Sequence, residues 1–234
     1  MSISIIDYGR GNLRSVQKGL EQAGTAEVVI SSDPAVLSTA DGLVLPGVGA
    51  FRDAMQRLHD TGLDELIRAA TSSGTPLLGI CLGMQLLLEV SYEFGVFEGL
   101  GLIPGEVRGF DTARHSLKVP HIGWNTVDFS SRDPLFADIV NESYFYFVHS
   151  YVCVPHDDAN VVGRTSYGAP FCSALRYGNI VGTQFHPEKS STTGLRLLQN
   201  FVMLCTTHNS SSAQLVMPGL TRHPEPRRSM KGET

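Results

Sequence analysis

The sequence contains no apolar run long enough to cross a bilayer, and its first residues, Ser2 to Ile6, carry neither a charged leader nor a cleavage site. We therefore expect a cytoplasmic protein that does not act on a membrane. Basic residues are not in excess, because the formal net charge is −5. This charge argues against nucleic acid as a partner of the folded part.

The cysteines of the sequence show no sign of disulfide pairing. The four cysteines stand at positions 81, 153, 172 and 205, with no regular pairing in their spacing and no Cys-x-x-Cys motif. Reduced thiols are the default for such a set, and no zinc site is indicated. The chain also lacks a phosphate-binding glycine loop of the Walker type. We expect neither a metal nor another cofactor.

The sequence does contain enough apolar material for one good-sized domain. Of its 234 residues, 42% are hydrophobic and 18% are charged, which is ordinary for a globular protein. In the first half, short apolar runs alternate with helical patterns, which predicts strands over 2–6, 26–30, 42–45 and 77–80 and helices over 13–23, 50–59 and 63–71. This alternation predicts a mostly parallel central sheet flanked by helices, with sites at the carboxyl ends of its strands.

From Gly105 the pattern changes to short alternating runs separated by turns, over residues 106–110, 124–129, 143–154, 160–166, 171–176 and 179–184. These runs predict an additional antiparallel layer that closes one side of the fold, followed by a last helix from about 192 to 204. Residues 206–234 are polar, punctuated by proline and without periodicity, which predicts a flexible tail. We expect one α/β domain over residues 1–205 and a C-terminal tail over 206–234.

Cys81 stands at the junction between a predicted strand, Leu77 to Ile80, and a segment of helical composition that begins at Leu82. Glycines at 79 and 83 flank it as Gly-x-Cys-x-Gly, the cysteine form of a nucleophile elbow, in which small neighbours allow a sharp turn. The first N–H groups of a helix favour the thiolate, and the N–H of Leu82 can point at an oxyanion. A lone cysteine is more often a buried structural residue. The two flanking glycines favour the nucleophile here.

Two segments resemble motifs of the class I glutamine amidotransferases. Residues 79–85, Gly-Ile-Cys-Leu-Gly-Met-Gln, resemble the nucleophile motif, and residues 183–190, Thr-Gln-Phe-His-Pro-Glu-Lys-Ser, resemble the His-x-Glu motif. Three further stretches narrow the match: 7–13 (Asp-Tyr-Gly-Arg-Gly-Asn-Leu), 46–51 (Pro-Gly-Val-Gly-Ala-Phe) and 119–125 (Val-Pro-His-Ile-Gly-Trp-Asn). Together they are similar to the glutaminase subunits of imidazole glycerol phosphate synthases, over roughly residues 2–205. The resemblance implies a single class I amidotransferase-like domain.

A thiolate at Cys81 that attacks the side-chain amide of glutamine needs a proton carrier for the departing ammonia, and His186 is the candidate. Glu188 lies two residues further on, with Pro187 stiffening the link, so its carboxylate can orient the imidazole as the third member of a triad. Taken alone, His-Pro-Glu is more often a surface turn. His149 is the rival base, but it has no carboxylate within a few residues and is better explained as a packed strand histidine.

The Pro46-Gly47-Val48-Gly49 loop ends a predicted strand, and its two glycines allow its peptides to rotate at low cost. This suits an oxyanion hole, although a tight turn whose glycines serve only geometry has the same composition. By the resemblance, the N–H of Val48 is the second oxyanion donor beside that of Leu82, after a peptide flip that makes activity conditional. One such donor contributes about 3 kcal/mol of transition-state stabilisation.

The resemblance also implies which groups bind the substrate glutamine: Gln85, Glu93 for the α-ammonium group, and the backbone at Gly47, Ser150 and Tyr151. Glu93 falls in a predicted loop over 91–99, where a glutamate is usually just solvated.

Three more residues correspond to family positions at the mouth where ammonia passes to a synthase subunit: Asn12, Tyr146 and Lys189. Each has a plainer interpretation, as a helix N-cap, a strand aromatic and a surface charge respectively. Trp124 belongs either to the core or to an interface, and the sequence does not separate these.

The implied function is that of a glutaminase subunit in a heterodimer, with a Cys81 thioester as the intermediate. The implied partner is a (β/α)8-barrel cyclase, which uses the ammonia to make imidazole glycerol phosphate and an aminoimidazole carboxamide ribotide in histidine biosynthesis. We expect the isolated chain to be a poor glutaminase that its partner switches on.

Other functions fit the same triad. It could serve another ammonia-channelling synthase, such as pyridoxal phosphate synthase, or a stand-alone γ-glutamyl hydrolase, although the motifs at 8–13 and Lys189 argue against both. A regulatory module that keeps the fold without turnover is the non-enzymatic alternative, and the intact Cys, His and Glu set argues against it.

Overall fold

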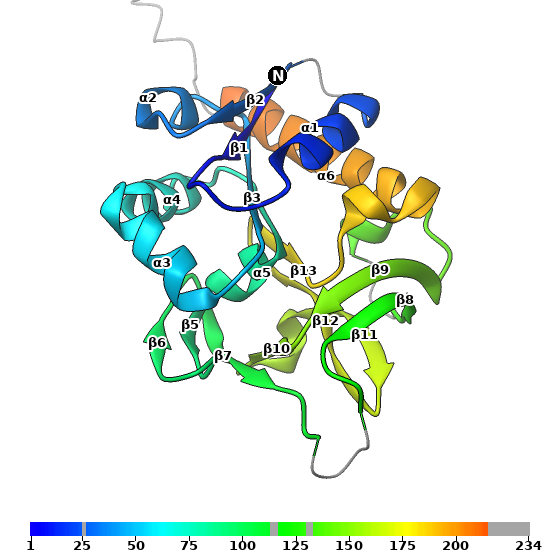
Figure 1. Cartoon of the computed structure of the whole chain (residues 1–234). Coiled ribbons are helices and arrows are strands. Elements are labelled where there is room, and N and C mark those ends of the chain that lie inside the picture. The colour runs from blue at the N-terminus through cyan, green and yellow to red at the C-terminus, as the bar shows by residue number, and fades with distance from the viewer. Residues whose placement is uncertain (25–26, 113–116, 130–132, 215–234) are drawn as a thin grey trace, which may run out of the picture.

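A mixed sheet of eleven strands forms the centre of the protein among the residues that the computed structural model describes, which are 1–24, 27–112, 117–129 and 133–214 (Figure 1). The strand order is β2-β1-β3-β4-β13-β12-β10-β7-β5-β6, and β11 pairs with β12. The first five strands in this order are parallel: β2 (Glu27–Ser31), β1 (Ser2–Ile6), β3 (Gly42–Gly47), β4 (Leu77–Cys81) and β13 (Ile180–Thr183). The predicted α/β fold with a parallel centre is therefore confirmed.

Helices cover both faces of the parallel strands (Figure 1). One face packs against α1 (Leu13–Gln22) and α6 (Ser191–Gln214), and the other packs against α2 (Pro34–Leu37), α3 (Phe51–Asp60), α4 (Leu63–Ser72) and α5 (Leu82–Leu86). Every residue of β3 and β4 is buried. Strands that are covered on both faces consist of continuous apolar residues. For this reason the sequence pattern identified β3 and β4.

The predicted antiparallel strands are present, but most of them extend the central sheet instead of forming a separate layer. The predicted strands that do so are β7 (Ile103–Gly109), β10 (Tyr151–Pro155), β11 (Val161–Tyr167) and β12 (Ala169–Tyr177). The sheet also contains β5 (Leu88–Ser91) and β6 (Phe97–Glu98), where no strand was predicted. The extension follows from the two-residue turn at Gly178 and Asn179, because it pairs β12 directly with β13 and so continues the ladder. In the described part of the chain, β8 (His121–Val127) and β9 (Ser143–His149) form a second, two-stranded sheet.

Several element boundaries differ from the prediction. The helix after Cys81 ends at Leu86, and β5 and β6 occupy parts of what was predicted as helix and loop. The returning chain causes this early end, because Leu100 donates to the carbonyl of Leu86 at 2.8 Å and Leu102 donates to that of Leu87 at 2.9 Å. The predicted run over 143–154 is two strands in different sheets, β9 and β10, with a break at Ser150.

The last helix is longer than predicted. Helix α6 continues to Gln214, so residues 206–214 are helical, and only 215–234 of the predicted tail lie outside the described residues. Thr206 and Thr207 fit a helix because their hydroxyls donate back to it, to the carbonyls of Val202 at 3.1 Å and Leu204 at 3.0 Å. The predicted first residue of β2, Ala26, also lies outside the described residues.

Short 3-10 helices complete the chain: η1 (Pro134–Phe136), η2 (Asp158–Asn160) and η3 (Pro187–Lys189). The last of these is separated from the end of β13 by three residues and contains Pro187 and Glu188, with His186 at its N-cap. The carboxyl ends of β3, β4 and β13 therefore meet at one edge of the sheet, and the break between β9 and β10 approaches the same edge. No described helix is long and apolar enough to cross a membrane.

Candidate active site

A cavity of about 530 Å³ lies at the carboxyl ends of β3 and β4. Its lining includes seven of the residues predicted from the sequence: Val48, Cys81, Leu82, Gln85, Glu93, Ser150 and Tyr151. The sheet register explains part of this grouping, because Gly47 at the end of β3 pairs with Cys81 at the end of β4.

Cys81 occupies a sharp turn between β4 and α5, with φ at +56° and ψ at −111°. Its two flanking glycines are required by close packing. A Cβ atom on Gly83 would lie 1.8 Å from the carbonyl oxygen of Leu45, and one on Gly79 would lie 2.9 Å from the carbonyl oxygen of Gly83. The structure thus has the strand, turn and helix order that the Gly-x-Cys-x-Gly pattern predicts.

His186 and Glu188 form a buried pair beside Cys81. The Nδ1 of His186 lies 2.8 Å from Oε1 of Glu188, and both side chains are almost inaccessible. Burial alone would lower the pKa of His186, but its interactions with Cys81 and Glu188 outweigh burial and raise that pKa to about 9. Within the described residues, Nε2 of His186 is buried without a hydrogen-bond partner. The imidazole is therefore oriented by Glu188 through one nitrogen and leaves the other for proton transfer.

His149, the rival base, is engaged at both ring nitrogens. Its Nδ1 donates to the carbonyl of Tyr151 at 2.9 Å, so its Nε2 accepts from Nδ1 of His121, also at 2.9 Å. Burial lowers the pKa of His149 to about 3, and the neighbouring His121 and His186 add to that effect. A neutral imidazole with no free nitrogen suits a packed residue, as its lack of a nearby carboxylate indicated.

The Pro46–Gly49 loop lies directly against the Cys81 turn. A Cβ atom on Gly47 would lie 2.9 Å from Cβ of Leu82 and 2.6 Å from the hydroxyl oxygen of Tyr8, so only glycine fits there. Gly49 has φ at +103°, and the side chain of Val48 is exposed at the cavity. The loop is thus placed where the resemblance puts an oxyanion donor.

Two of the residues expected to bind glutamine, Gln85 and Glu93, are held by hydrogen bonds within the chain. Gln85 is 5% exposed, and its Nε2 donates to the carbonyl of Tyr151 and to Oε1 of Gln184, both at 3.1 Å. Glu93 is half-buried instead of merely solvated, because its Oε2 accepts a hydrogen bond of 2.6 Å from the amide of Phe51 at the start of α3.

Sequence reasoning missed Gln184 as part of the site. Its Nε2 lies 3.8 Å from Sγ of Cys81, and its Oε1 holds Gln85. The signal was available, because Gln184 stands two residues before His186 in the quoted segment. The contact between Gln184 and Cys81 joins residues 103 positions apart in the sequence, which no local pattern reveals.

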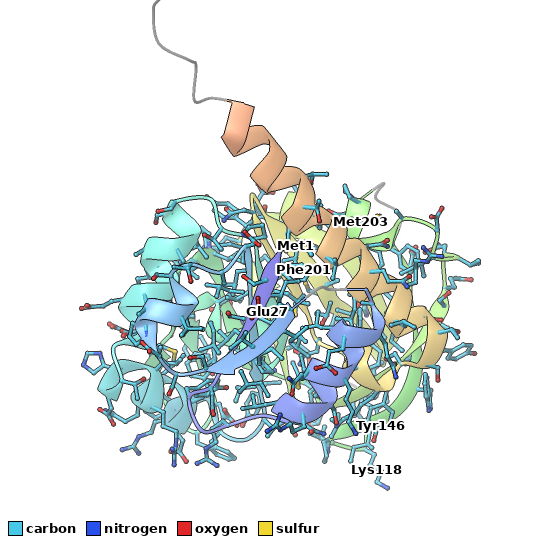
Figure 2. The ribbon with its side chains drawn as sticks, turned by 90° about the horizontal axis from the view of Figure 1, so that it is seen from above. Met1, Glu27, Lys118, Tyr146, Phe201 and Met203 are labelled. Atoms are coloured by element: carbon cyan, nitrogen blue, oxygen red, sulfur yellow. The ribbon has the colours of Figure 1, made fainter. Side chains whose placement is uncertain are left out.

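Of the three predicted interface residues, Tyr146 and Lys189 lie beside His186, whose amide donates to the carbonyl of Tyr146 at 2.9 Å and whose carbonyl accepts from the amide of Lys189 at 3.1 Å. Asn12 is exposed at the N-cap of α1, where its carbonyl accepts from Ser15 and Val16 and its side chain makes no capping bond. The Nζ of Lys189 lies 5.9 Å from the ring centroid of Tyr146. Figure 2 shows Tyr146 toward the lower edge of the view, whereas Met203 of α6 lies higher.

Trp124 is exposed, which rules out the core and leaves the interface of the two interpretations that the sequence left open. Its side chain is 51% accessible and packs edge-on against Tyr146, with ring centroids 6.0 Å apart. Two further large apolar residues of the same two-stranded sheet, Ile122 and Tyr144, are 59% and 61% exposed. This β8–β9 surface is therefore apolar and uncovered in the isolated chain.

Comparison with known proteins identifies the relatives of this chain. Residues 4–205 match the family model described as glutamine amidotransferase class-I. The chain is 50% identical to the imidazole glycerol phosphate synthase subunit HisH of Geobacter sulfurreducens over 85% of this chain and 97% of that protein, and 50% identical to the same-named subunit of Aquifex aeolicus over 86% and 96%. A crystal structure of a glutamine amidotransferase superposes with a TM-score of 0.69 at 18% identity, covering 87% of this chain and 98% of that one.

Proposed function

The chain belongs to the class-I glutamine amidotransferase family, and we propose that it is the glutaminase subunit of an imidazole glycerol phosphate synthase in histidine biosynthesis. The names of its relatives at 50% identity favour this acceptor over pyridoxal phosphate synthase or a stand-alone hydrolase. The observation that carries the proposal is the position of Cys81, on its glycine-flanked turn at the cavity, beside the buried His186–Glu188 pair.

Glutamine hydrolysis would proceed in two steps through Cys81. The Sγ atom attacks the amide carbon of glutamine, and the C–N bond breaks as His186 donates a proton to the departing nitrogen, which leaves ammonia and a γ-glutamyl thioester. Water then attacks the thioester carbon and its proton passes to His186, after which the C–S bond breaks, releasing glutamate and restoring the Cys81 thiolate. Because the pKa of His186 is about 9, the imidazole carries the proton that the first step needs at neutral pH.

Each tetrahedral intermediate places a negative charge on the former amide oxygen. The amides of Leu82 and Val48 are the proposed donors to this oxygen, since both residues line the cavity together with Cys81. The rest of the substrate would be held by Gln85, by Glu93 at the α-ammonium group, and by the backbone at Gly47, Ser150 and Tyr151. Of these residues, Gln85, Glu93, Ser150 and Tyr151 line the same cavity, which supports the assignment.

Ammonia would pass to a separate cyclase subunit with a (β/α)8 barrel, which makes imidazole glycerol phosphate and an aminoimidazole carboxamide ribotide. The relatives are named as subunits of a synthase, so a second subunit is implied. Asn12, Tyr146 and Lys189 are the residues proposed at the passage. The exposed apolar surface around Trp124 supports a docking face beside them.

The amidotransferase domain is proposed to span residues 1–205, which agrees with the matched range of 4–205. We propose a cytoplasmic location, because all four cysteines are free and buried, as suits a reducing compartment.

The test is steady-state glutamine hydrolysis by the purified chain alone, with the cyclase subunit, and with the cyclase subunit plus its nucleotide substrate. The proposal predicts a slow rate for the chain alone and the highest rate with all components. A ligand that prefers the active conformation by about 3 kcal/mol raises the active population roughly a hundredfold. Equal rates in the three conditions would contradict gating of the oxyanion loop but leave the glutaminase assignment intact. No hydrolysis in any condition would contradict the proposed function.

A further inference from the structure

Tyr8 holds the strand end that leads into the oxyanion loop. It follows β1, is 3% exposed, and its hydroxyl donates to the carbonyl of Pro46 at 3.0 Å. The ladder between β1 and β3 covers only Ile3–Ile5 against Gly42–Val44, so Pro46 lies beyond it. Proline has no N–H, and its carbonyl is therefore the only backbone group it can use. The Tyr8 hydroxyl supplies the donor that β1 no longer provides.

The Tyr8 hydroxyl also lies against Gly47, the residue that follows Pro46. A Cβ atom on Gly47 would be 2.6 Å from the hydroxyl oxygen, so any larger residue at position 47 would push against the tyrosine as well as against Leu82. The loop is also held at its far end, where the amide of Phe51 donates to Glu93 at 2.6 Å. The four residues Gly47–Ala50 thus lie between two fixed backbone groups, the Pro46 carbonyl and the Phe51 amide.

The hydroxyl remains a hydrogen-bond donor over the working pH range. Burial and the neighbouring Cys81 raise the pKa of Tyr8 well above its ordinary value, although Arg10 opposes this. A tyrosine that keeps its proton keeps the hydrogen bond to Pro46, so the anchor does not depend on pH near neutrality.

We propose that Tyr8 is a positioning residue for catalysis, whose hydroxyl fixes the Pro46 carbonyl and thereby the place at which the Val48 amide meets the oxyanion. The inference rests on the proposed glutaminase function. With Pro46 fixed, rotation is confined to the peptides around Gly47 and Gly49, and the donor reaches one position. Pairing with Ile80 and Cys81 of β4 holds the other side of this strand end. Without the hydroxyl, the β1 side of Pro46 loses its anchor, and the donor is misplaced part of the time.

The test is Tyr8→Phe in the complex with the cyclase subunit and its nucleotide substrate. We expect kcat for glutamine hydrolysis to fall roughly tenfold, less than the loss of an entire oxyanion donor, with KM for glutamine little changed. Alkylation of Cys81 by iodoacetamide should stay within about twofold of the wild-type rate, because that displacement forms a C–S bond and releases iodide without any oxyanion. Thr71→Val, which removes a buried hydroxyl that donates to Ile67 within α4, is the matched control and should leave kcat unchanged.

Amide hydrogen exchange over residues 47–50 of the free chain gives a readout that does not depend on turnover. Exchange should be faster in Tyr8→Phe than in the wild type and unchanged in Thr71→Val. An unchanged kcat, or an equal loss of kcat and alkylation rate, would overturn the positioning role of Tyr8 while leaving wild-type glutaminase activity as support for the proposed function. A wild-type complex that hydrolyses no glutamine would overturn both.

Discussion

Cys81 differs from the other three cysteines in both its backbone and its surroundings. A residue with a side chain in such a positive-φ turn costs roughly 1–3 kcal/mol, which the packing of Gly79 and Gly83 must offset. Burial raises the pKa of Cys172 to about 12, and Cys153 faces it across β10 and β12 with its pKa also raised. Those thiols stay protonated inside the sheet, whereas Cys81 lines the cavity.

The members of the proposed triad should contribute unequally. His186→Ala removes the proton carrier and should lower kcat by roughly 10²- to 10⁴-fold. Glu188→Ala only loosens the imidazole and should cost less. His149→Asn should also cost less than His186→Ala, because the pKa of about 3 keeps His149 neutral and both of its nitrogens are occupied. Steady-state kinetics of the three variants decide the order, and a larger loss in His149→Asn than in His186→Ala would transfer the base role to His149.

The raised pKa of His186 predicts that its contribution to the free energy of unfolding decreases as the pH rises. The folded pKa of about 9 exceeds the ordinary value of 6.5, so the charged imidazole stabilises the fold below pH 6.5, and this contribution is lost as pH rises to about 9. The difference in free energy of unfolding between wild type and His186→Gln should therefore shrink over that range in urea titrations. The value of kcat/KM should fall on the same alkaline limb. A pH-independent difference between the two proteins would contradict the assignment.

At the scale of elements, local patterns were sufficient for four of the five parallel strands. The run 179–184 was assigned to the antiparallel layer, but β13 pairs in parallel with β4. Strands β3 and β4 are buried apolar runs, and the glycines around Cys81 mark a turn with a steric requirement. The anchors of the oxyanion loop could not be predicted in this way. Tyr8 meets Pro46 across 38 positions and Glu93 meets Phe51 across 42, and neither contact leaves a local periodicity.

The break of the predicted run 143–154 was missed for a related reason. Alternation continues through Ser150, but the chain changes sheets there, because β9 pairs with β8 and β10 pairs with β7 and β12. A period of two in the sequence does not report which strand is the neighbour. The break matters to the site, since Ser150 and Tyr151 line the cavity.

The end of α6 gives a test at this scale. Cys205 is fully buried, and the two described side chains after it, Thr206 and Thr207, are exposed. Truncation after Gln214 should change neither melting temperature nor glutaminase rate. Truncation after Cys205 also removes the exposed Thr206 and Thr207 and should cost less than about 1 kcal/mol, with activity kept. A large loss of stability or activity in either truncated chain would show that the removed residues dock on the domain.

At the scale of the whole molecule, the proposed site would supply ammonia to a second subunit. Free ammonia at neutral pH is mostly protonated and loses its nucleophilic lone pair, so a product used elsewhere must be passed on without release to water. The exposed apolar side chains of Ile122, Trp124 and Tyr144 lie on the sheet that also carries Tyr146. A second subunit docked there would cover this apolar surface next to the proposed passage.

The most direct test compares glutamine and ammonium salts as nitrogen donors for the synthesis of imidazole glycerol phosphate by the complex with the cyclase subunit. With Cys81→Ala, glutamine-dependent synthesis should be abolished and ammonium-dependent synthesis should match that of the wild type, because the cyclase can take ammonia from solution. Cys172→Ala, a buried cysteine away from the cavity, should retain both activities. Glutamine-dependent synthesis that survives in the Cys81→Ala complex would contradict the account.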